Sequence, residues 1–264
     1  MTDKPRESAV RGVLLDLSGV LYVGDEALPG AKAAIAALRK SGISFRLITN
    51  TTRSTRRQIA EKLTRLGFDF DEGQIFTPPM AVGQYLDQHG LRPHLLVHPN
   101  LTGEFSGYDQ HDPNALVMGD AGEYFDYASL NAAFHVLQNG AEFIAMGDNR
   151  YFREADGLSL DIGPFVKALE YTSGRKATIV GKPAKAFFMQ AVAALGCKPE
   201  AVLMVGDDAL ADVEGALRAG LQAALVKTGK YQPGDEGNIS LPGWRLIGDI
   251  GDLPQLLGIV RQSS

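Results

Sequence analysis

Short apolar runs alternate with amphipathic helical stretches along the chain, and this alternation limits the possible folds more than any other feature. Val13-Leu14-Leu15 is a continuous apolar run, as expected of a strand that is buried on both faces of a parallel sheet. Residues 29–42 then place apolar side chains at helical spacing, after an opening proline and before a closing glycine. An apolar run at 44–50 and a helical stripe at 56–68 repeat the pattern. The repetition predicts an α/β fold on a parallel sheet with right-handed crossovers.

The same alternation continues through the rest of the chain. We expect further buried strands at 94–99, 114–120, 141–148, 177–183, 201–208 and 221–229. We expect further helices at 127–140, 163–174, 184–196 and 210–220, with a last one within 253–264. The stretches 77–80 and 172–178 interrupt the pattern and indicate junctions. The sequence therefore predicts a core domain formed by 1–80 and 180–264, with a smaller α/β domain, 81–179, inserted into it.

Charge and composition exclude several classes of protein. The chain has 26 basic and 31 acidic residues, a net charge of −5, which is unsuited to binding nucleic acid through net charge. The opening residues are polar and no run of 18 apolar residues occurs, so we expect a cytoplasmic protein without a membrane span. Cys197 is the single cysteine, which excludes a disulfide framework and a cysteine-based zinc site.

Ligands of open α/β sheets bind at the carboxyl ends of the strands, so the polar residues that follow the apolar runs are the candidate site. They comprise carboxylates, hydroxyls, an amide and one lysine: Asp16, Ser18, Thr49, Asn50, Lys182, Asp207, Asp208 and Asp212. The set contains no histidine, because all five histidines lie between residues 89 and 135. A histidine-based triad or zinc site at these strand ends is therefore disfavoured.

These residue types suit the transfer of a phosphoryl group. An aspartate such as Asp16 can attack phosphorus and divide one displacement into two steps. The charge of the phosphate requires neutralisation, which Mg²⁺ and Lys182 can provide. Mg²⁺ prefers carboxylate and carbonyl oxygens, as Asp16 and Asp207 offer, and Thr49 and Asn50 can donate hydrogen bonds to phosphate oxygens. A dinucleotide-binding enzyme is disfavoured, because no Gly-x-Gly-x-x-Gly follows the first strand.

Four segments carry a resemblance to a known family: LLDLSGV at 14–20, TN at 49–50, GKP at 181–183, and GDD at 206–208 followed by Asp212. In this order they resemble the four motifs of the haloacid dehalogenase-like hydrolases, and the resemblance extends over nearly the whole chain. Part of the insertion, YFREADGLSLDIGPFVKALEY, resembles the stretch that joins a type-two cap to its core in that family. The resemblance implies a Rossmann-like core with an inserted α/β cap that covers the site and selects the leaving group.

The resemblance also implies a role for each matched residue. Asp16 would be the nucleophile that becomes an aspartyl-phosphate, while Thr49 and Asn50 hold the phosphate and Lys182 bridges nucleophile and phosphate. Asp207 would bind Mg²⁺ together with Asp16 and the backbone carbonyl of Ser18. Asp208 and Asp212 would orient the ligands from outside the coordination sphere. The many apolar residues of 114–146 are compatible with a homodimer formed through the cap.

One position departs from the pattern of most phosphatases in the family. Where they have an aspartate that serves as general acid and base, this chain has Ser18, whose hydroxyl is a weak acid. We therefore expect substrates that need little protonation of the leaving group: pyrophosphate or phosphoramidates. The resemblance implies phosphorylated lysine and histidine side chains as the phosphoramidates. A second interpretation stays open, in which the protein binds a phosphorylated ligand but turns it over weakly.

Overall fold

The computed structural model describes residues 9–154 and 157–259, which form two compact units. The core unit comprises Met1–Thr49, Ala60–Phe76 and Lys185–Ser264, and the inserted unit comprises Asn50–Ile59 and Thr77–Ala184. The chain passes into the inserted unit after Phe76 and returns to the core unit after Ala184. Residues 50–59 group with the inserted unit, in which Arg53 forms an ion pair with Asp120, with its Nε 2.6 Å from Oδ2.

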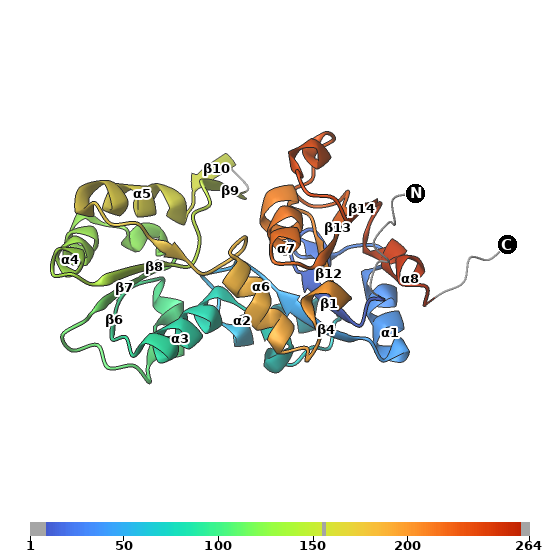
Figure 1. Ribbon diagram of the computed structural model, residues 1–264, viewed down its shortest axis with the longest axis horizontal. Coiled ribbons are helices and arrows are strands. Elements are labelled where there is room, and N and C mark those ends of the chain that lie inside the picture. Colours follow the sequence, from blue (N-terminus) through green and yellow to red (C-terminus); the bar gives the residue numbers. More distant parts are fainter. Residues whose placement is uncertain (1–8, 155–156, 260–264) are drawn as a thin grey trace, which may run out of the picture. The chain divides into compact units, whose positions relative to one another are not determined.

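A six-stranded parallel sheet forms the centre of the core unit (Figure 1). Its strand order is β14-β13-β12-β1-β4-β5. The strands are β1 (Gly12–Asp16), β4 (Ser44–Ile48), β5 (Ile75–Phe76), β12 (Val202–Gly206), β13 (Gln222–Val226) and β14 (Trp244–Ile247). Every residue of β1 and of β12 is buried, as their continuous apolar runs predict for the middle of a parallel sheet. A short hairpin, β2 (Tyr22–Val23) and β3 (Glu26–Ala27), follows β1.

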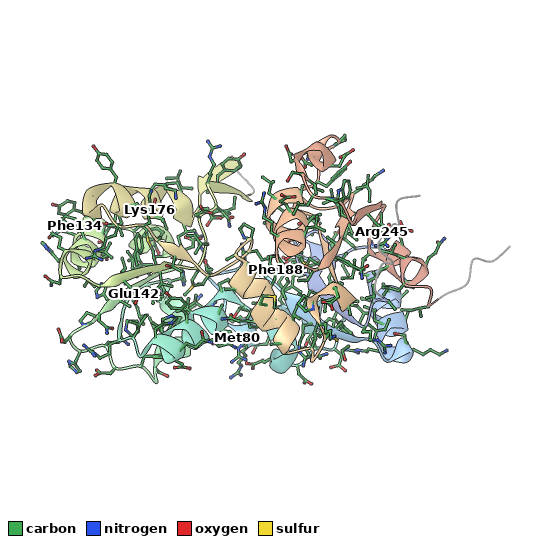
Figure 2. All side chains as sticks on the ribbon, in the orientation of Figure 1. Met80, Phe134, Glu142, Lys176, Phe188 and Arg245 are labelled. Atoms are coloured by element: carbon green, nitrogen blue, oxygen red, sulfur yellow. The ribbon has the colours of Figure 1, made fainter. Side chains whose placement is uncertain are left out.

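The chain leaves the middle of this sheet in opposite directions, toward β4 and β5 from β1 and toward β13 and β14 from β12. Right-handed crossovers therefore put the helices that follow β1 and β12 on opposite faces. The helices of the core unit are α1 (Ala31–Ser41), α6 (Lys185–Ala193), α7 (Gly215–Arg218) and α8 (Leu253–Leu256), and α2 (Arg56–Arg65) spans the junction of the two units. Phe188 of α6, labelled in Figure 2, is fully buried. The gap between β1 and β12 is thus the switch point, where open α/β sheets bind ligands.

The inserted unit contains a smaller parallel sheet of order β11-β8-β7-β6. Its strands are β6 (Pro93–Leu96), β7 (Ala115–Met118), β8 (Glu142–Ala145) and β11 (Thr178–Ile179), and β9 (Tyr151–Glu154) pairs with β10 (Gly157–Leu160) in a separate hairpin. Its helices are α3 (Pro78–His89), α4 (Tyr127–Gln138) and α5 (Ile162–Ser173). Figure 1 shows α4 and α5 side by side against this sheet, where Leu116, Ala133 and Val166 belong to one buried cluster.

Short 3-10 or π-helical turns complete the architecture: η1 (Glu72–Gln74), η2 (Pro99–Phe105), η3 (Gly122–Tyr124), η4 (Pro199–Ala201), η5 (Ala209–Glu214), η6 (Asp235–Asn238) and η7 (Ile250–Asp252). The α/β class and the parallel sheets predicted from the sequence are confirmed. Two predicted elements are wrong in extent. The strand expected at 177–183 has only two residues, and the helix expected at 210–220 begins as the π-helical turn η5.

The last predicted helix is also shorter than expected. It stops at Leu256, and Gly258 follows in a left-handed conformation with φ 67°, which suits a residue without a Cβ. Residues 260–264 of that prediction lie outside the described residues. Within residues 9–154 and 157–259, no helix combines the length and the apolar character that crossing a bilayer requires.

Candidate active site

The carboxyl ends of β1, β4 and β12 meet at one edge of the core sheet, and a polar residue stands at each. Asp16 is the last residue of β1 and pairs with Ile48, so Thr49 comes directly after that pair on β4. On the other side Leu15 pairs with Val205, and Asp207 comes directly after the end of β12. The register therefore places Thr49 and Asp207 on either side of Asp16, and all three are buried.

Three carboxylates converge at this edge. Carboxylate oxygens of Asp16, Asp207 and Asp212 lie within 4.8 Å of one another. Asp212 reaches the group from the turn η5, where its Oδ2 accepts a hydrogen bond of 3.2 Å from the backbone N–H of Asp208. Asp212 thus lies in the same carboxylate cluster as Asp16 and Asp207.

Asp208 has a different position, although it is adjacent to Asp207. Its Oδ1 accepts hydrogen bonds from the backbone N–H groups of Leu210 and Ala211, at 3.0 and 2.9 Å. This is the arrangement of an N-cap, in which a side-chain oxygen satisfies the free N–H groups at the start of a helical turn. Asp208 therefore fixes the turn that carries Asp212.

Two glycines allow the chain to approach Asp207 closely. Gly19 has φ 87° and Gly229 has φ 66°, a left-handed conformation that residues with a Cβ rarely adopt. A Cβ at either position would collide with Oδ2 of Asp207. The loop after β13 also contacts this region through two hydrogen bonds. The Lys230 N–H donates to Oδ2 of Asp207 at 2.7 Å, and the Thr228 hydroxyl donates to the Gly19 carbonyl at 2.5 Å. Thr228 and Lys230 are not among the residues predicted for the site, although their loop too follows a buried strand.

The electrostatics of the cluster favour a bound cation. Burial, with repulsion from Asp16 and Asp212, raises the pKa of Asp207 to about 8, against the opposing effect of the Lys230 N–H and charge. Buried carboxylates at this spacing are costly unless a positive charge compensates them. All three groups are hard oxygen donors, the type that Mg²⁺ prefers. The donor set therefore fits a hard divalent cation.

Ser18 lies in the turn that follows Asp16, and it is exposed. The turn is held by a hydrogen bond of 2.7 Å from the Gly19 N–H to the Tyr22 carbonyl. Tyr22 begins the hairpin, and burial, followed by the negative charges of Asp16 and Asp25, raises its pKa to about 12. The phenol of Tyr22 is thus neutral at physiological pH.

Asn50 and Lys182 belong to the inserted unit, where the structure brings them into direct contact. The Asn50 Nδ2 donates to the Lys182 carbonyl, and the Asn50 Oδ1 accepts from the Lys182 N–H, both at 2.9 Å. Lys182 is buried, with 4% of its surface exposed. The contact joins two of the predicted site residues across 132 positions of sequence.

Comparison with known proteins agrees with this geometry. A family model described as haloacid dehalogenase-like hydrolase matches residues 13–111, and a second, HAD-hydrolase-like, matches residues 179–253. The chain is 43% identical over 263 residues to phospholysine phosphohistidine inorganic pyrophosphate phosphatase of Rattus norvegicus, covering 97% of this chain and 96% of the relative. It is 46% identical over 234 residues to haloacid dehalogenase-like hydrolase domain-containing protein 2 of Homo sapiens, covering 89% and 90%.

A solved structure gives the same result for the fold. The 4-nitrophenylphosphatase of Thermotoga maritima is 26% identical in sequence and superposes with a TM-score of 0.87, over 93% of this chain and 97% of its own. The four motifs, the strand-end carboxylates and the high identity to curated relatives agree with one another. The chain belongs to the haloacid dehalogenase-like hydrolases.

Proposed function

We propose that the protein is a Mg²⁺-dependent phosphohydrolase that acts through an aspartyl-phosphate at Asp16. The observation that carries the proposal is the convergence of Asp16, Asp207 and Asp212 at the switch point of the core sheet. Family membership supports it, because the family's members include relatives that are named as phosphatases.

The reaction proceeds in two displacements. A carboxylate oxygen of Asp16 attacks phosphorus while the bond to the leaving group breaks, and the leaving group departs with the bonding electron pair. Water then attacks the acyl phosphate, which releases inorganic phosphate and restores the carboxylate. Thr49 and the backbone of Asn50 would hold the phosphate oxygens, and the Lys182 ammonium would neutralise the negative charge of the phosphate. Asp16, Asp207 and the Ser18 carbonyl would hold Mg²⁺, with Asp212 beside them, and the bound metal would supply further charge neutralisation.

We further propose that the substrates are phosphoramidates, on a small molecule or on a phosphorylated lysine or histidine side chain, or pyrophosphate. Ser18 supports this, because general acid catalysis contributes about 10²–10⁴-fold and a serine hydroxyl is a poor proton donor. A phosphoramidate nitrogen can be protonated before the attack, and the phosphate that leaves pyrophosphate needs little protonation. The name of the Rattus norvegicus relative, phospholysine phosphohistidine inorganic pyrophosphate phosphatase, points to the same substrates.

A leaving-group series tests this choice of substrate. We expect kcat/KM for a set of aryl and alkyl phosphates to fall steeply as the pKa of the leaving group rises, and imidodiphosphate to be a far better substrate than glycerol phosphate. Ser18→Asp is expected to flatten the slope, because it supplies the missing proton donor, whereas the control Ser18→Ala leaves the slope unchanged. Equal rates on glycerol phosphate and imidodiphosphate would show that another group protonates the leaving atom. Failure to release phosphate from any of them would favour a binding protein instead.

We also propose that the protein forms a homodimer through the inserted unit. Leu116, Ala133 and Phe143, from the apolar stretch 114–146, pack into that unit's own core and so are unavailable for an interface. Tyr124 and Tyr127 of the same stretch are 44% and 84% exposed, and large exposed aromatic residues are typical of interfaces. Light scattering is expected to give the mass of a dimer for the wild type and a lower mass for Tyr127→Ser. A monomeric wild type at high micromolar concentration would contradict the proposal.

A further inference from the structure

The side-chain amide of Asn50 uses both its donor and its acceptor in hydrogen bonds to the main chain of one residue, Lys182. Its Nδ2 donates to the carbonyl of Lys182 and its Oδ1 accepts from the N–H of Lys182, each at 2.9 Å. A primary amide has one acceptor oxygen and one donor nitrogen, so this pairing also defines which way the amide group faces. Asn50 therefore holds the backbone from which the lysine side chain projects.

The segment on the other side of this backbone is held as well. Val180 N–H donates to the Ala145 carbonyl at 2.9 Å, which continues the pairing of β11 with β8. At Gly181 a Cβ would collide with the carbonyl of Met146 and would lie 3.0 Å from the Asn50 Oδ1. Only a glycine allows the chain to pass this closely between Met146 and Asn50. Lys182 is thus fixed by the end of β8 through Gly181 and by Asn50 directly.

We propose that Asn50 is a positioning residue for Lys182, which acts by holding the lysine main chain rather than by binding phosphate through its own side chain. The inference rests on the proposed function, in which the Lys182 ammonium neutralises the phosphate. A displacement of about 1 Å in a reacting constellation can lower the rate by about a hundredfold, so precise placement of the lysine matters. The segment that holds the phosphate and the segment that carries the lysine would then respond to substrate as one unit.

The two roles make different predictions for a double-mutant cycle. Lys182→Met removes the ammonium but keeps the main chain, and with it both hydrogen bonds to Asn50. If Asn50 acts through the lysine, Asn50→Ala weakens the binding of inorganic phosphate in the wild type but changes it by less than about twofold in the Lys182→Met background. If the Asn50 side chain binds phosphate itself, the losses of phosphate affinity caused by Asn50→Ala and by Lys182→Met multiply in the double variant.

Calorimetric titration with inorganic phosphate in the presence of Mg²⁺ measures the phosphate affinity of the wild type, the two single variants and the double variant. The values of kcat and KM for p-nitrophenyl phosphate are measured on the same four proteins. We expect Asn50→Ala to lower kcat by about 10- to 100-fold. Asn50→Asp keeps the size and the acceptor but removes the donor to the Lys182 carbonyl, so it should show a similar loss and serves if Asn50→Ala does not fold. Asn100→Ala is the matched control, since its Nδ2 also donates to a main-chain carbonyl, that of Arg53 at 3.1 Å, and its phosphate affinity should be unchanged.

The outcomes separate this inference from the function on which it rests. A wild type that binds and releases phosphate, with a cycle in which the losses multiply, overturns the positioning role and leaves the phosphatase intact. A wild type that neither binds phosphate with Mg²⁺ nor hydrolyses any substrate overturns the proposed function. Wild-type phosphate affinity and kcat in Asn50→Ala would show that the lysine does not depend on the asparagine, and would also overturn the inference.

Discussion

Asp16→Asn is expected to lower phosphate release by at least about 10³-fold while the protein remains folded. The amide has nearly the volume of the carboxylate, so the buried end of β1 should keep its packing. It cannot form an acyl phosphate, however, and no other nucleophile is proposed at this edge of the sheet. The measurement is the turnover of imidodiphosphate and p-nitrophenyl phosphate at saturating Mg²⁺, with circular dichroism as the check of the fold.

Asp208→Asn is the matched control for this experiment, because Asp208 caps the turn η5 through an oxygen that an amide also offers. It is expected to keep most of the activity. Asp16→Asn activity above about a tenth of the wild-type rate, equivalent to less than ~1.4 kcal/mol of transition-state stabilisation, would remove Asp16 as the nucleophile.

Activity is expected to disappear in EDTA and to return with Mg²⁺, while Ca²⁺ competes and inhibits. The carboxylates of Asp16, Asp207 and Asp212 form an oxygen-only donor group, and Ca²⁺ accepts a higher coordination number that would misplace the attacking carboxylate. Activity is measured after EDTA treatment and after the addition of each metal in turn. Undiminished activity in EDTA, or rescue by Zn²⁺ alone, would contradict the proposed metal.

Asp207 gives a second prediction for the proposed metal site, which does not depend on catalysis. The pKa of Asp207 is raised from its ordinary 3.8 to about 8, so folding favours its protonated form. The free-energy cost of the ionised side chain in the metal-free protein therefore grows as the pH rises through this interval and is greatest above about 8. Asp207→Asn should raise the melting temperature of the metal-free protein more at pH 8 than at pH 5, and it should abolish the stabilisation by Mg²⁺ seen in the wild type.

Asp208→Asn is again the control, and it should keep the stabilisation by Mg²⁺. If Asp207→Asn were destabilising at pH 8 and still stabilised by Mg²⁺, the carboxylate would be structural and the metal would bind elsewhere.

The residues at strand ends were predictable because their position depends on local pattern. The apolar runs before Asp16, Thr49 and Asp207 mark buried strands, and polar residues that directly follow such runs lie at the carboxyl edge of a parallel sheet. The order of the strands in the sheet, in contrast, could not be predicted from local pattern. That β1 and β12 are neighbours results from the pairing of segments nearly two hundred residues apart, which no local pattern encodes.

The side-chain contacts beyond the strand ends were not predictable for the same reason. Asp212 joins the cluster with Asp16 and Asp207 from η5, which is wound as a π-helical turn, whereas its sequence indicates an ordinary helix. The sequence predicts that Asn50 contacts phosphate. The pairing of its side-chain amide with the main chain of Lys182 depends on the fold, which brings together residues that are 132 positions apart. The pattern at Pro78-Pro79 indicates a junction and does not predict α3, although prolines also fit the first turn of a helix.

The central claim is that Asp16 carries the phosphoryl group during the reaction. Radiolabelled pyrophosphate is mixed with the Mg²⁺-loaded enzyme, quenched in acid within the first turnover, and the protein is digested and mapped. We expect label on the peptide that contains Asp16, its release by hydroxylamine, as an acyl phosphate requires, and no label in Asp16→Asn. Phosphate release by the wild type with no labelled protein at any quench time, or with the label on another residue, would contradict the account.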